Sequence, residues 1–143
     1  MINILTGIDS TASALNAERI RMDVISQNIA NVNTTHGLDG KPYQRQQVVF
    51  ETVLRDQQAG DISGAGAQSV QVARIEKDNR PPRMIYNPGS PDANAQGMVA
   101  VPNINISEEM VDMIASSRAY EANLAVIRNA RAMAVQTLAI GKH

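Results

Sequence analysis

The residues of this sequence that could do chemistry are few and far apart. His36 and His143 are its only histidines, and the absence of cysteine excludes a cysteine-based zinc site or a disulfide framework. His36 falls in a segment expected to be a loop, and His143 is the last residue of the sequence. Each is expected to be an ordinary exposed side chain rather than a metal ligand or a general base. The sequence therefore predicts no metal site.

Two further patterns suggest catalysis or nucleotide binding, but their context argues against both. Glu108 and Glu109 could form an acid/base pair, yet neighbouring residues on a helix point in different directions. Gly64-Ala65-Gly66 has the composition of a phosphate-binding loop, but neither a helix nor a Lys-Ser/Thr pair follows it. No Ser/His/Asp set can be proposed. We therefore expect no enzymatic activity and no cofactor.

The composition narrows the class of protein further. The formal net charge is −1, which gives no reason to expect nucleic acid or an anionic membrane as a partner. No apolar run approaches the ~20 residues of a membrane span, and the first residues lack the basic start of a targeting signal. Aromatic residues make up only 3% of the chain, so burial must come from aliphatic side chains and methionine. A soluble protein is expected, either as one domain or as one small domain with extensions.

Apolar side chains recur at helical spacing near both ends of the chain. Such a repeat, sustained over several turns, is typical of helices that wrap around other helices. The first stripe consists of Ile8, Leu15, Met22 and Ile29, with Ile25 between the last two. The second stripe consists of Met110, Met113, Tyr120, Leu124, Ile127, Ala134 and Leu138. The pattern favours a building block that assembles with other helices over an enzyme.

Capping residues set the expected bounds of these two helices. The first helix is predicted over residues 9–29, with Ser10 or Thr11 as its N-cap. It should end in residues 31–37, where Asn and Gly tolerate the left-handed conformation that closes helices. The last helix is predicted over residues 107–140, capped by Ser107, favoured by two glutamates in its first turn and stopped by Gly141.

The middle of the chain is predicted to be β-structure and loop. Strands are expected at residues 47–50, 70–72, 83–86 and 98–101, with Ile75 either extending the second strand or following a bulge. Turns are expected at residues 39–40 and 87–89, and a flexible loop at residues 57–68. The predicted fold is α+β: terminal helices form a coiled-coil bundle, and a small antiparallel β domain lies between them. The predicted parts are residues 1–36, 37–105 and 106–143.

The two predicted helices differ in length, so a simple pair leaves turns of the longer helix uncovered. Depending on the register, the uncovered residues are either Met110, Val111, Met113 and Ile114, or Met133, Val135 and Leu138. One partner helix also cannot cover so wide an apolar face. Contacts with other subunits best explain this surface.

Two polar pairs on the helices have open interpretations. Asn28 and Asn31 lie three residues apart on one helix face, where they could cap the helix end or make polar contacts with adjacent helices. Arg118 and Glu121, also three apart, are expected to form at most a weak surface pair, with an interface role for Arg118 as the alternative.

Four segments carry a resemblance to a known family. Residues 28–34, Asn-Ile-Ala-Asn-Val-Asn-Thr, resemble the N-terminal signature of bacterial flagellar axial proteins, those of the rod and hook. Residues 42–50 and 103–123 are similar to segments of the basal-body rod members of that family, as is the ending at residues 138–142. Arg131 stands where the family leads us to expect a lysine, which keeps the charge. The short chain fits a proximal-rod protein better than a distal-rod or hook protein.

The resemblance implies a structural subunit of the proximal rod, exported by the flagellar type III apparatus without a cleaved signal peptide and assembled in the periplasm into the torque-transmitting shaft. The implied partners are further copies, other rod proteins, the junction with the MS ring of the rotor and the export apparatus, without direct membrane insertion. The alternatives are a small periplasmic enzyme or ligand-binding module, or a helical export adaptor that never polymerises. The expected subunit-interface residues are Ile8, Leu15, Met22, Ile25, Asn28, Ile29, Asn31, Met110, Met113, Arg118, Tyr120, Asn123, Leu124, Ile127, Ala134 and Leu138.

Overall fold

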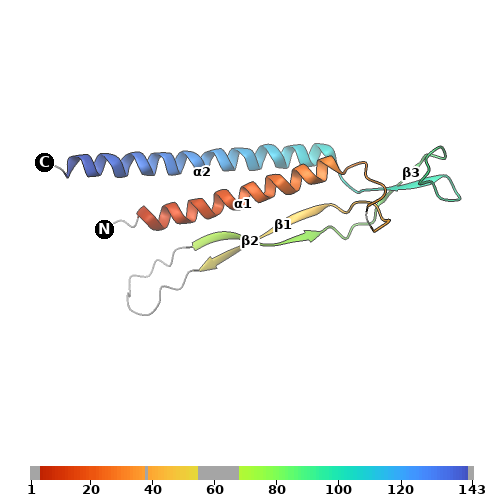
Figure 1. The fold of residues 1–143 in the computed structure, drawn as a ribbon, viewed down its shortest axis with the longest axis horizontal. Coiled ribbons are helices and arrows are strands. Elements are labelled where there is room, and N and C mark those ends of the chain that lie inside the picture. The colour runs from red at the N-terminus through yellow and green to blue at the C-terminus, as the bar shows by residue number, and fades with distance from the viewer. Residues whose placement is uncertain (1–3, 38, 55–67, 142–143) are drawn as a thin grey trace.

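Two long helices and two small antiparallel sheets make up the computed structural model of the chain (Figure 1). It describes residues 4–37, 39–54 and 68–141. The expected loop at 57–68, with its Gly64-Ala65-Gly66 segment, lies outside the described residues except for Gln68, which begins a strand, and His143 also lies outside them. In chain order the elements are α1 (Ile4–Ala30), β1 (Gln46–Leu54), β2 (Gln68–Lys77), β3 (Arg83–Tyr86), β4 (Met98–Val101) and α2 (Ile106–Ile140).

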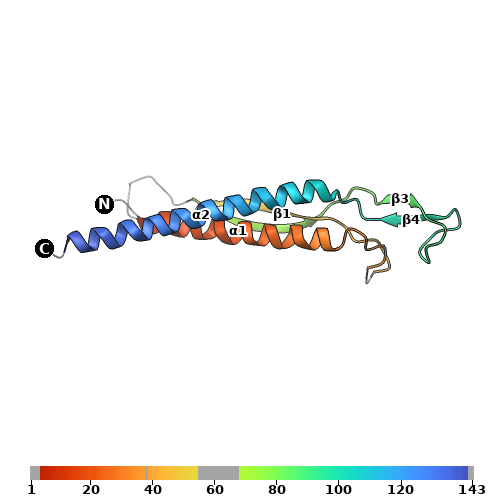
Figure 2. The same cartoon turned by 90° about the horizontal axis from the view of Figure 1, so that it is seen from above.

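Helix α1 is the middle layer of the elongated part of the molecule. It packs against α2 on one side and against the β1–β2 hairpin on the other, and no strand packs against α2 (Figure 1). The two helices run antiparallel and cross at a shallow angle, as the view in Figure 2 shows. The buried apolar core among the described residues is small and consists of Ala17, Val24, Ile25, Val99 and Ile104.

The strands form two separate sheets rather than the single small sheet that the sequence suggests. Strand β1 pairs only with β2, and β3 pairs only with β4. Pro81 and Pro82 precede β3, and Pro102 follows β4, so the backbone cannot continue a hydrogen-bonded ladder through either junction. Residues 83–101, which comprise β3, β4 and their connection, are called the ribbon below. The ribbon lies at the end of the molecule opposite the chain termini (Figures 1 and 2).

The β1–β2 hairpin contains the bulge that was one of two expectations for Ile75. Val49 pairs with Arg74, but Phe50 pairs with Val72, so the residue of β2 between Val72 and Arg74 is unpaired. Ile75 pairs with Val48 and belongs to β2. The strand therefore continues through the bulge, which restores the face that it presents to α1.

The predicted start of α1 is wrong. The helix begins at Ile4, so Ser10 and Thr11 lie inside it and cap nothing. The hydroxyl of Thr11 instead donates to the carbonyl of Gly7, four residues earlier, at 2.7 Å. A Ser or Thr hydroxyl at an N-cap accepts from a backbone N–H, whereas within a helix it can donate to a carbonyl one turn earlier, so the presence of a hydroxyl alone does not mark a helix boundary.

The helix ends also differ in detail from the expected caps. After Ala30 the chain turns through hydrogen bonds from Asn31 N to Gln27 O and from Thr34 N to Asn31 O, and no residue of 31–37 has a positive φ. The N-cap of α2 is Asn105 rather than Ser107: the Asn105 side chain accepts from the Ser107 backbone N–H at 3.1 Å. The stop at Gly141 is confirmed.

The register between the helices decides which end of α2 is uncovered. The Ser116 hydroxyl donates to the Glu18 carboxylate at 2.5 Å, and Arg21 lies 3.8 Å from Asp112. Continued along both helices at ~1.5 Å per residue, this register places the start of α1 near Arg131. The last turns of α2 therefore extend beyond α1, as Figure 1 shows. Their apolar side chains are 57–76% exposed: Met133, Val135, Leu138 and Ile140.

The accessible surface reflects this open architecture. The chain exposes 10608 Å², whereas a compact monomer of 15.4 kDa is expected to expose about 7,200 Å². Helices α1 and α2, of 27 and 35 residues, span roughly 40 and 52 Å. A layered rod of this length cannot bury its side chains as a sphere would.

The turn that closes the ribbon yields a first prediction. Gly97 has φ of +75°, and a Cβ there would lie 2.9 Å from Tyr86 Cε2 and 3.2 Å from Pro88 Cβ. Gly97→Ala is expected to destabilise the ribbon by about 1–2 kcal/mol through backbone strain, seen as faster amide exchange in β3 and β4. Gly89→Ala is the matched control, because its nearest neighbouring atom is 3.8 Å away. Equal exchange in the two variants would contradict the prediction.

Candidate functional site

The most ordered polar feature of the fold is a junction centred on Asn28, near the end of α1. The Asn28 side chain is 1% exposed. Its Nδ2 donates to Gln46 O at 2.8 Å and to Glu109 Oε2 at 3.0 Å. Its Oδ1 accepts from Gln46 N at 2.9 Å and from the Tyr43 hydroxyl at 3.1 Å. Both donors and both acceptor positions of the amide are therefore used, and Asn28 joins α1 to the start of β1 and to α2.

Glu109 is the second centre of this junction. It lies in the first turns of α2 and is 0% exposed. Arg45 Nε donates to Glu109 Oε1 at 2.6 Å, and the Asn28 amide donates to the other oxygen. A buried carboxylate is costly unless such partners neutralise it, and the positive end of the helix dipole adds further stabilisation. Glu108, its neighbour, is exposed, so the two carboxylates do point apart as expected.

Arg45 extends the junction toward the helix interface. Its side chain is 18% exposed, and Nη2 lies 3.9 Å from Asp112, which also faces Arg21 of α1 at 3.8 Å. The charges thus alternate from α1 to α2 to the segment before β1. Because these long-range partners come from three parts of the chain, the junction fixes their relative positions.

The junction changes the titration of Tyr43. Burial raises the pKa of its phenol, and the negative charge of Glu109 raises it further. The phenol stays protonated at neutral pH and donates its proton to Asn28. It therefore acts here as a hydrogen-bond donor rather than as an acid or a nucleophile.

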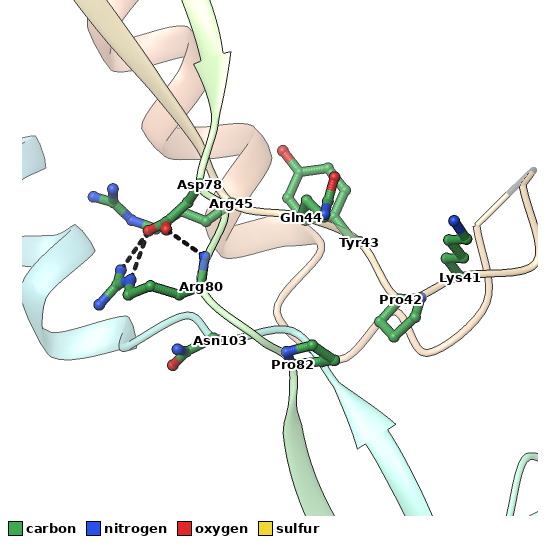
Figure 3. Close-up of a pocket in the computed structure, with 9 residues that line it drawn as sticks. All are labelled: Lys41, Pro42, Tyr43, Gln44, Arg45, Asp78, Arg80, Pro82 and Asn103. Carbon is green, nitrogen blue, oxygen red and sulfur yellow. Dashed lines mark hydrogen bonds and ion pairs between the residues drawn. The ribbon is translucent and has the colours of Figure 1, made fainter.

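A hollow of about 290 Å³ lies beside the junction, between the segment 41–45, the end of β2 and the segment before α2 (Figure 3). Asp78 and Arg80 face each other on its wall: Arg80 Nε donates to Asp78 Oδ2 at 2.8 Å. This bond lowers the pKa of the Asp78 carboxyl. The remaining residues on the wall are Lys41, Pro42, Tyr43, Gln44, Arg45, Pro82 and Asn103.

The buried polar side chains of the described residues are engaged with one another or with the backbone. No buried side-chain nitrogen or oxygen within the described ranges lacks a hydrogen-bond partner. Over the same residues, no group of three or more His, Asp or Glu side chains could hold a metal ion. His36 is exposed and lies 3.3 Å from Asp92. The geometry is that of a structural joint.

The residues predicted to form subunit interfaces fall into three classes of exposure. Ile25 and Asn28 are buried within the subunit. Met110, Arg118 and Leu138 are exposed. The others are half-buried, and they are Ile8, Leu15, Met22, Ile29, Asn31, Met113, Tyr120, Asn123, Leu124, Ile127 and Ala134. Most residues of the predicted stripes are thus half-buried in the subunit, whereas Leu138, near the end of α2, is exposed.

Both open interpretations of polar pairs gain detail. The Asn31 amide donates to the Gln27 carbonyl at 2.8 Å and so serves the end of its own helix. Asn28 makes a polar contact with an adjacent helix, as the second interpretation expected, but the helix is α2 of the same chain, and the amide also bonds to Gln46 of β1. Among the described residues, Arg118 and Glu121 form no ion pair with each other.

Sequence reasoning did not identify Tyr43, Arg45 or Glu109 as members of a common site. The three have no mutual spacing to notice, since 64 residues separate Arg45 from Glu109. A glutamate in the first turn of a helix is expected for the helix dipole alone. The only signal was indirect: the segments 42–50 and 103–123 that carry the family resemblance contain these residues.

Comparison with known proteins gives consistent matches. Residues 8–37 match the model for "Flagella basal body rod protein", and residues 95–140 match "Flagellar basal body rod FlgEFG protein C-terminal". The flagellar basal-body rod protein FlgC of Borreliella burgdorferi is 40% identical, over 97% of this chain and 98% of its own. The FlgC protein of Bacillus subtilis is 39% identical, over 94% of this chain and 96% of its own. That of Escherichia coli O157:H7 is 36% identical, over 97% of this chain and 98% of its own.

None of the described helices is both long and apolar enough to cross a membrane.

The buried carboxylate provides a second prediction. Glu109→Gln removes the charge that neutralises Arg45 and places an amide donor toward Asn28 or Arg45. We expect the free energy of unfolding to fall by about 2–3 kcal/mol, less than for a fully buried pair because Arg45 is partly exposed. Urea unfolding measures the change. Glu108→Gln is the matched control on an exposed neighbour, and a loss as large in the control would show that burial is not the cause.

The third prediction concerns alkaline pH. The raised pKa of Tyr43 in the folded state means that its contribution to stability is fully present below about pH 10 and is lost as the pH rises through the folded pKa. Tyr43→Phe removes this titration together with the hydrogen bond to Asn28. The stability difference between wild type and Tyr43→Phe, measured by urea unfolding from pH 8 to 11, should therefore shrink at the alkaline end. A difference that stays constant or grows would refute the assignment.

Proposed function

Because the chain belongs to the FlgC family of flagellar basal-body rod proteins, we propose that it is a structural subunit of the proximal rod, which polymerises in the periplasm into the shaft that transmits torque. It is a structural rod protein and not an enzyme, as the family implies. The observation that carries the polymerisation proposal is the set of apolar turns of α2 that extend beyond α1.

The exposed apolar side chains of α2 support assembly through that helix. Its last turns carry Met133, Val135, Leu138 and Ile140 at 57–76% exposure, with no other described element against them. Near its start, Met110, Val111 and Ile114 are 53–65% exposed. Apolar side chains exposed along one element in this way are typical of surfaces that contact other proteins. We propose that copies of this chain and other rod proteins cover them.

The interface residues expected from the sequence enter this proposal with one refinement. Leu138, Met110 and Arg118 are accessible on the isolated subunit and can contact a neighbour directly. The half-buried members of both stripes would contribute their remaining exposed surface. Asn28 would act on assembly through the position of the helices, because its amide is saturated within the subunit.

The route to the rod is proposed from the family. We infer export through the flagellar type III apparatus without signal cleavage, followed by contact with neighbouring rod proteins and with the junction to the MS ring. The layered fold suits a load-bearing part, because α1 is held between α2 and the hairpin. Ser116 and Arg21 cross-link the two helices through polar contacts, and Arg45 links the segment before β1 to α2. Such contacts resist sliding of one helix along the other.

The two alternative functions have weaker support. A ligand-binding module needs a pocket with polar groups that converge on free space. In the hollow near Tyr43, the charged side chains of Asp78, Arg80 and Arg45 are already paired with one another or with Glu109. A non-polymerising adaptor would leave the apolar turns of α2 permanently in water.

A substitution in the uncovered turns tests the proposal. Leu138 is 73% exposed, so Leu138→Asp should change the stability of the monomer by less than about 0.5 kcal/mol. In an assembled rod the same carboxylate would be buried without a partner, at a cost of several kcal/mol. We expect loss of swimming in soft agar and loss of the protein from isolated basal bodies. Gln136→Asp, which adds the same charge without removing an apolar side chain, should retain partial or full motility. Normal swimming with Leu138→Asp as the only copy would disprove the role of these turns.

A further inference from the structure

Strand β3 is the exposed outer strand of a ribbon that is anchored through β4. In β4 the Val99 side chain is 4% exposed, and the segment that follows contains the buried residues Pro102 and Ile104. All four residues of β3 are exposed, by contrast, and Met84 and Tyr86 are 49% and 69% exposed. An edge strand that is held in place in this way is preorganised to pair with another strand.

The outer edge of β3 carries backbone groups without partners among the described residues. Asn87 N donates to Gly97 O at 2.8 Å across the ribbon. Because the direction of these bonds alternates along an antiparallel strand, the N–H and C=O of Ile85 also point toward β4, whereas those of Met84 and Tyr86 point away from it. No hydrogen bond within the described ranges reaches the backbone of Met84 or Tyr86. The edge therefore offers donors and acceptors at the spacing of a β-strand.

The chain closes the opposite edge of the ribbon itself. On β4 the outward N–H of Met98 donates to Asn94 Oδ1 at 2.9 Å, and the Met98 carbonyl accepts from Asn94 N at 2.9 Å. No comparable contact from the described residues covers β3. An open strand edge commonly binds an extended segment, which adds to the sheet through main-chain hydrogen bonds. The occupant of the β3 edge is therefore expected to be another strand.

Two prolines set the length and register of a strand that can pair with β3. Pro82 and Pro88 lie three residues before and after Ile85, and neither has a backbone N–H to donate. When two copies of β3 pair antiparallel about Ile85, Met84 of each copy lies opposite Tyr86 of the other. Pro82 then lies opposite Pro88, so the positions without donors coincide at the two ends of the pair. A shift of two residues in either direction would place a proline opposite Met84 or Tyr86 and leave an acceptor without a donor. The sequence of β3 is therefore self-complementary in a single register.

The side chains and the shape of the molecule suit the same register. Met84 and Tyr86 point to one face of the strand, so each thioether lies beside the aromatic ring of the other copy. Arg83 lies opposite Asn87 rather than opposite its own counterpart, which keeps the two positive charges apart. Antiparallel pairing reverses one copy, and the ribbon lies at the end of the molecule opposite the termini (Figures 1 and 2). The two helix pairs therefore extend away from each other and do not collide.

We propose that two free subunits associate through their β3 edges, about a two-fold axis at Ile85, and that the two ribbons form one four-stranded antiparallel sheet. Such a contact is isologous and closes after two copies, whereas a filament is built from heterologous contacts. The dimer is therefore a state of the free subunit, separate from the contacts of an assembled shaft, and it does not rest on the proposed rod function. Edge pairing of two short strands buries less than the ~1,200 Å² of a standard interface, so a dissociation constant on the order of 0.1–1 mM is expected.

Charge variants at position 85 test the dimer and its register. Ile85→Lys or Ile85→Glu places like charges directly opposite each other across the two-fold axis, which should lower the dimer association constant by about ten-fold or more. Mixing the two variants in equal amounts places opposite charges there and should restore association, because position 85 faces its own counterpart only in this register. Sedimentation equilibrium of the full-length proteins measures both effects, over concentrations that bracket the expected dissociation constant.

Amide exchange gives a second readout, residue by residue. Exchange at the Met84 and Tyr86 N–H groups should slow as the protein concentration rises. Exchange at Ala100, whose N–H lies on the outer edge of β4, should not change. Slow exchange at Val99, whose N–H points toward β3, shows that the ribbon remains folded in each variant.

Leu138→Asp is the matched control, because it adds a charge at an exposed apolar residue outside the ribbon. It should leave the dimer association constant unchanged. The proposal is overturned if the wild type stays monomeric over the whole range, or if the mixture of Ile85 variants associates no more strongly than either variant alone. It is equally overturned if Leu138→Asp, and not the Ile85 variants, removes the association. Motility is not a readout here, so a failure of the rod proposal and a failure of the dimer can be distinguished.

Discussion

A single buried negative charge sets the arrangement of this subunit. The carboxylate of Glu109 has no access to water, so it must be neutralised by groups that the rest of the chain brings to it. Arg45 and Asn28 do this from two different segments, and Asn28 in turn anchors the first residue of β1 through both backbone groups of Gln46. The end of α1, the start of the hairpin and the start of α2 therefore have one relative position that satisfies all of them. The small apolar core specifies that position less strictly, because the hydrophobic effect is non-directional whereas hydrogen bonds require a defined geometry.

The parts of the fold that could be predicted from the sequence are those specified by local patterns. The spacing of Ile8, Leu15, Met22 and Ile29 predicts a helix that packs on another helix, and the antiparallel pair follows. The strands at 83–86 and 98–101 are bounded by proline and turn residues and have the predicted limits. The division into two sheets could also have been inferred from Pro81, Pro82 and Pro102. Caps were less reliable, because a hydroxyl can also bond inside a helix, as Thr11 does by donating to the carbonyl of Gly7.

The junction itself could not be predicted, because its specificity lies in contacts between residues that are far apart in sequence. The most buried side chains of α2 are Glu109 and Ser116, polar residues that a search for apolar periodicity passes over. Their burial depends on small neighbours: Ala17 lies in the same interface and is 3% exposed, so the helices can come close enough for Ser116 to reach Glu18. An apolar stripe thus predicts that two helices pair, whereas the buried polar residues between them determine the register.

The hydrogen bonds of the Asn28 side chain also limit when the subunit can fold. A chain that emerges N-terminus first, from a ribosome or from a narrow channel, presents Asn28 long before Glu109 follows, 81 residues later. Until then α1 has neither its partner helix nor the charge that holds Arg45, and an isolated amphipathic helix is marginally stable in water. The subunit therefore cannot close early around its first half. The junction can therefore form only after the start of α2 has followed Asn28 out.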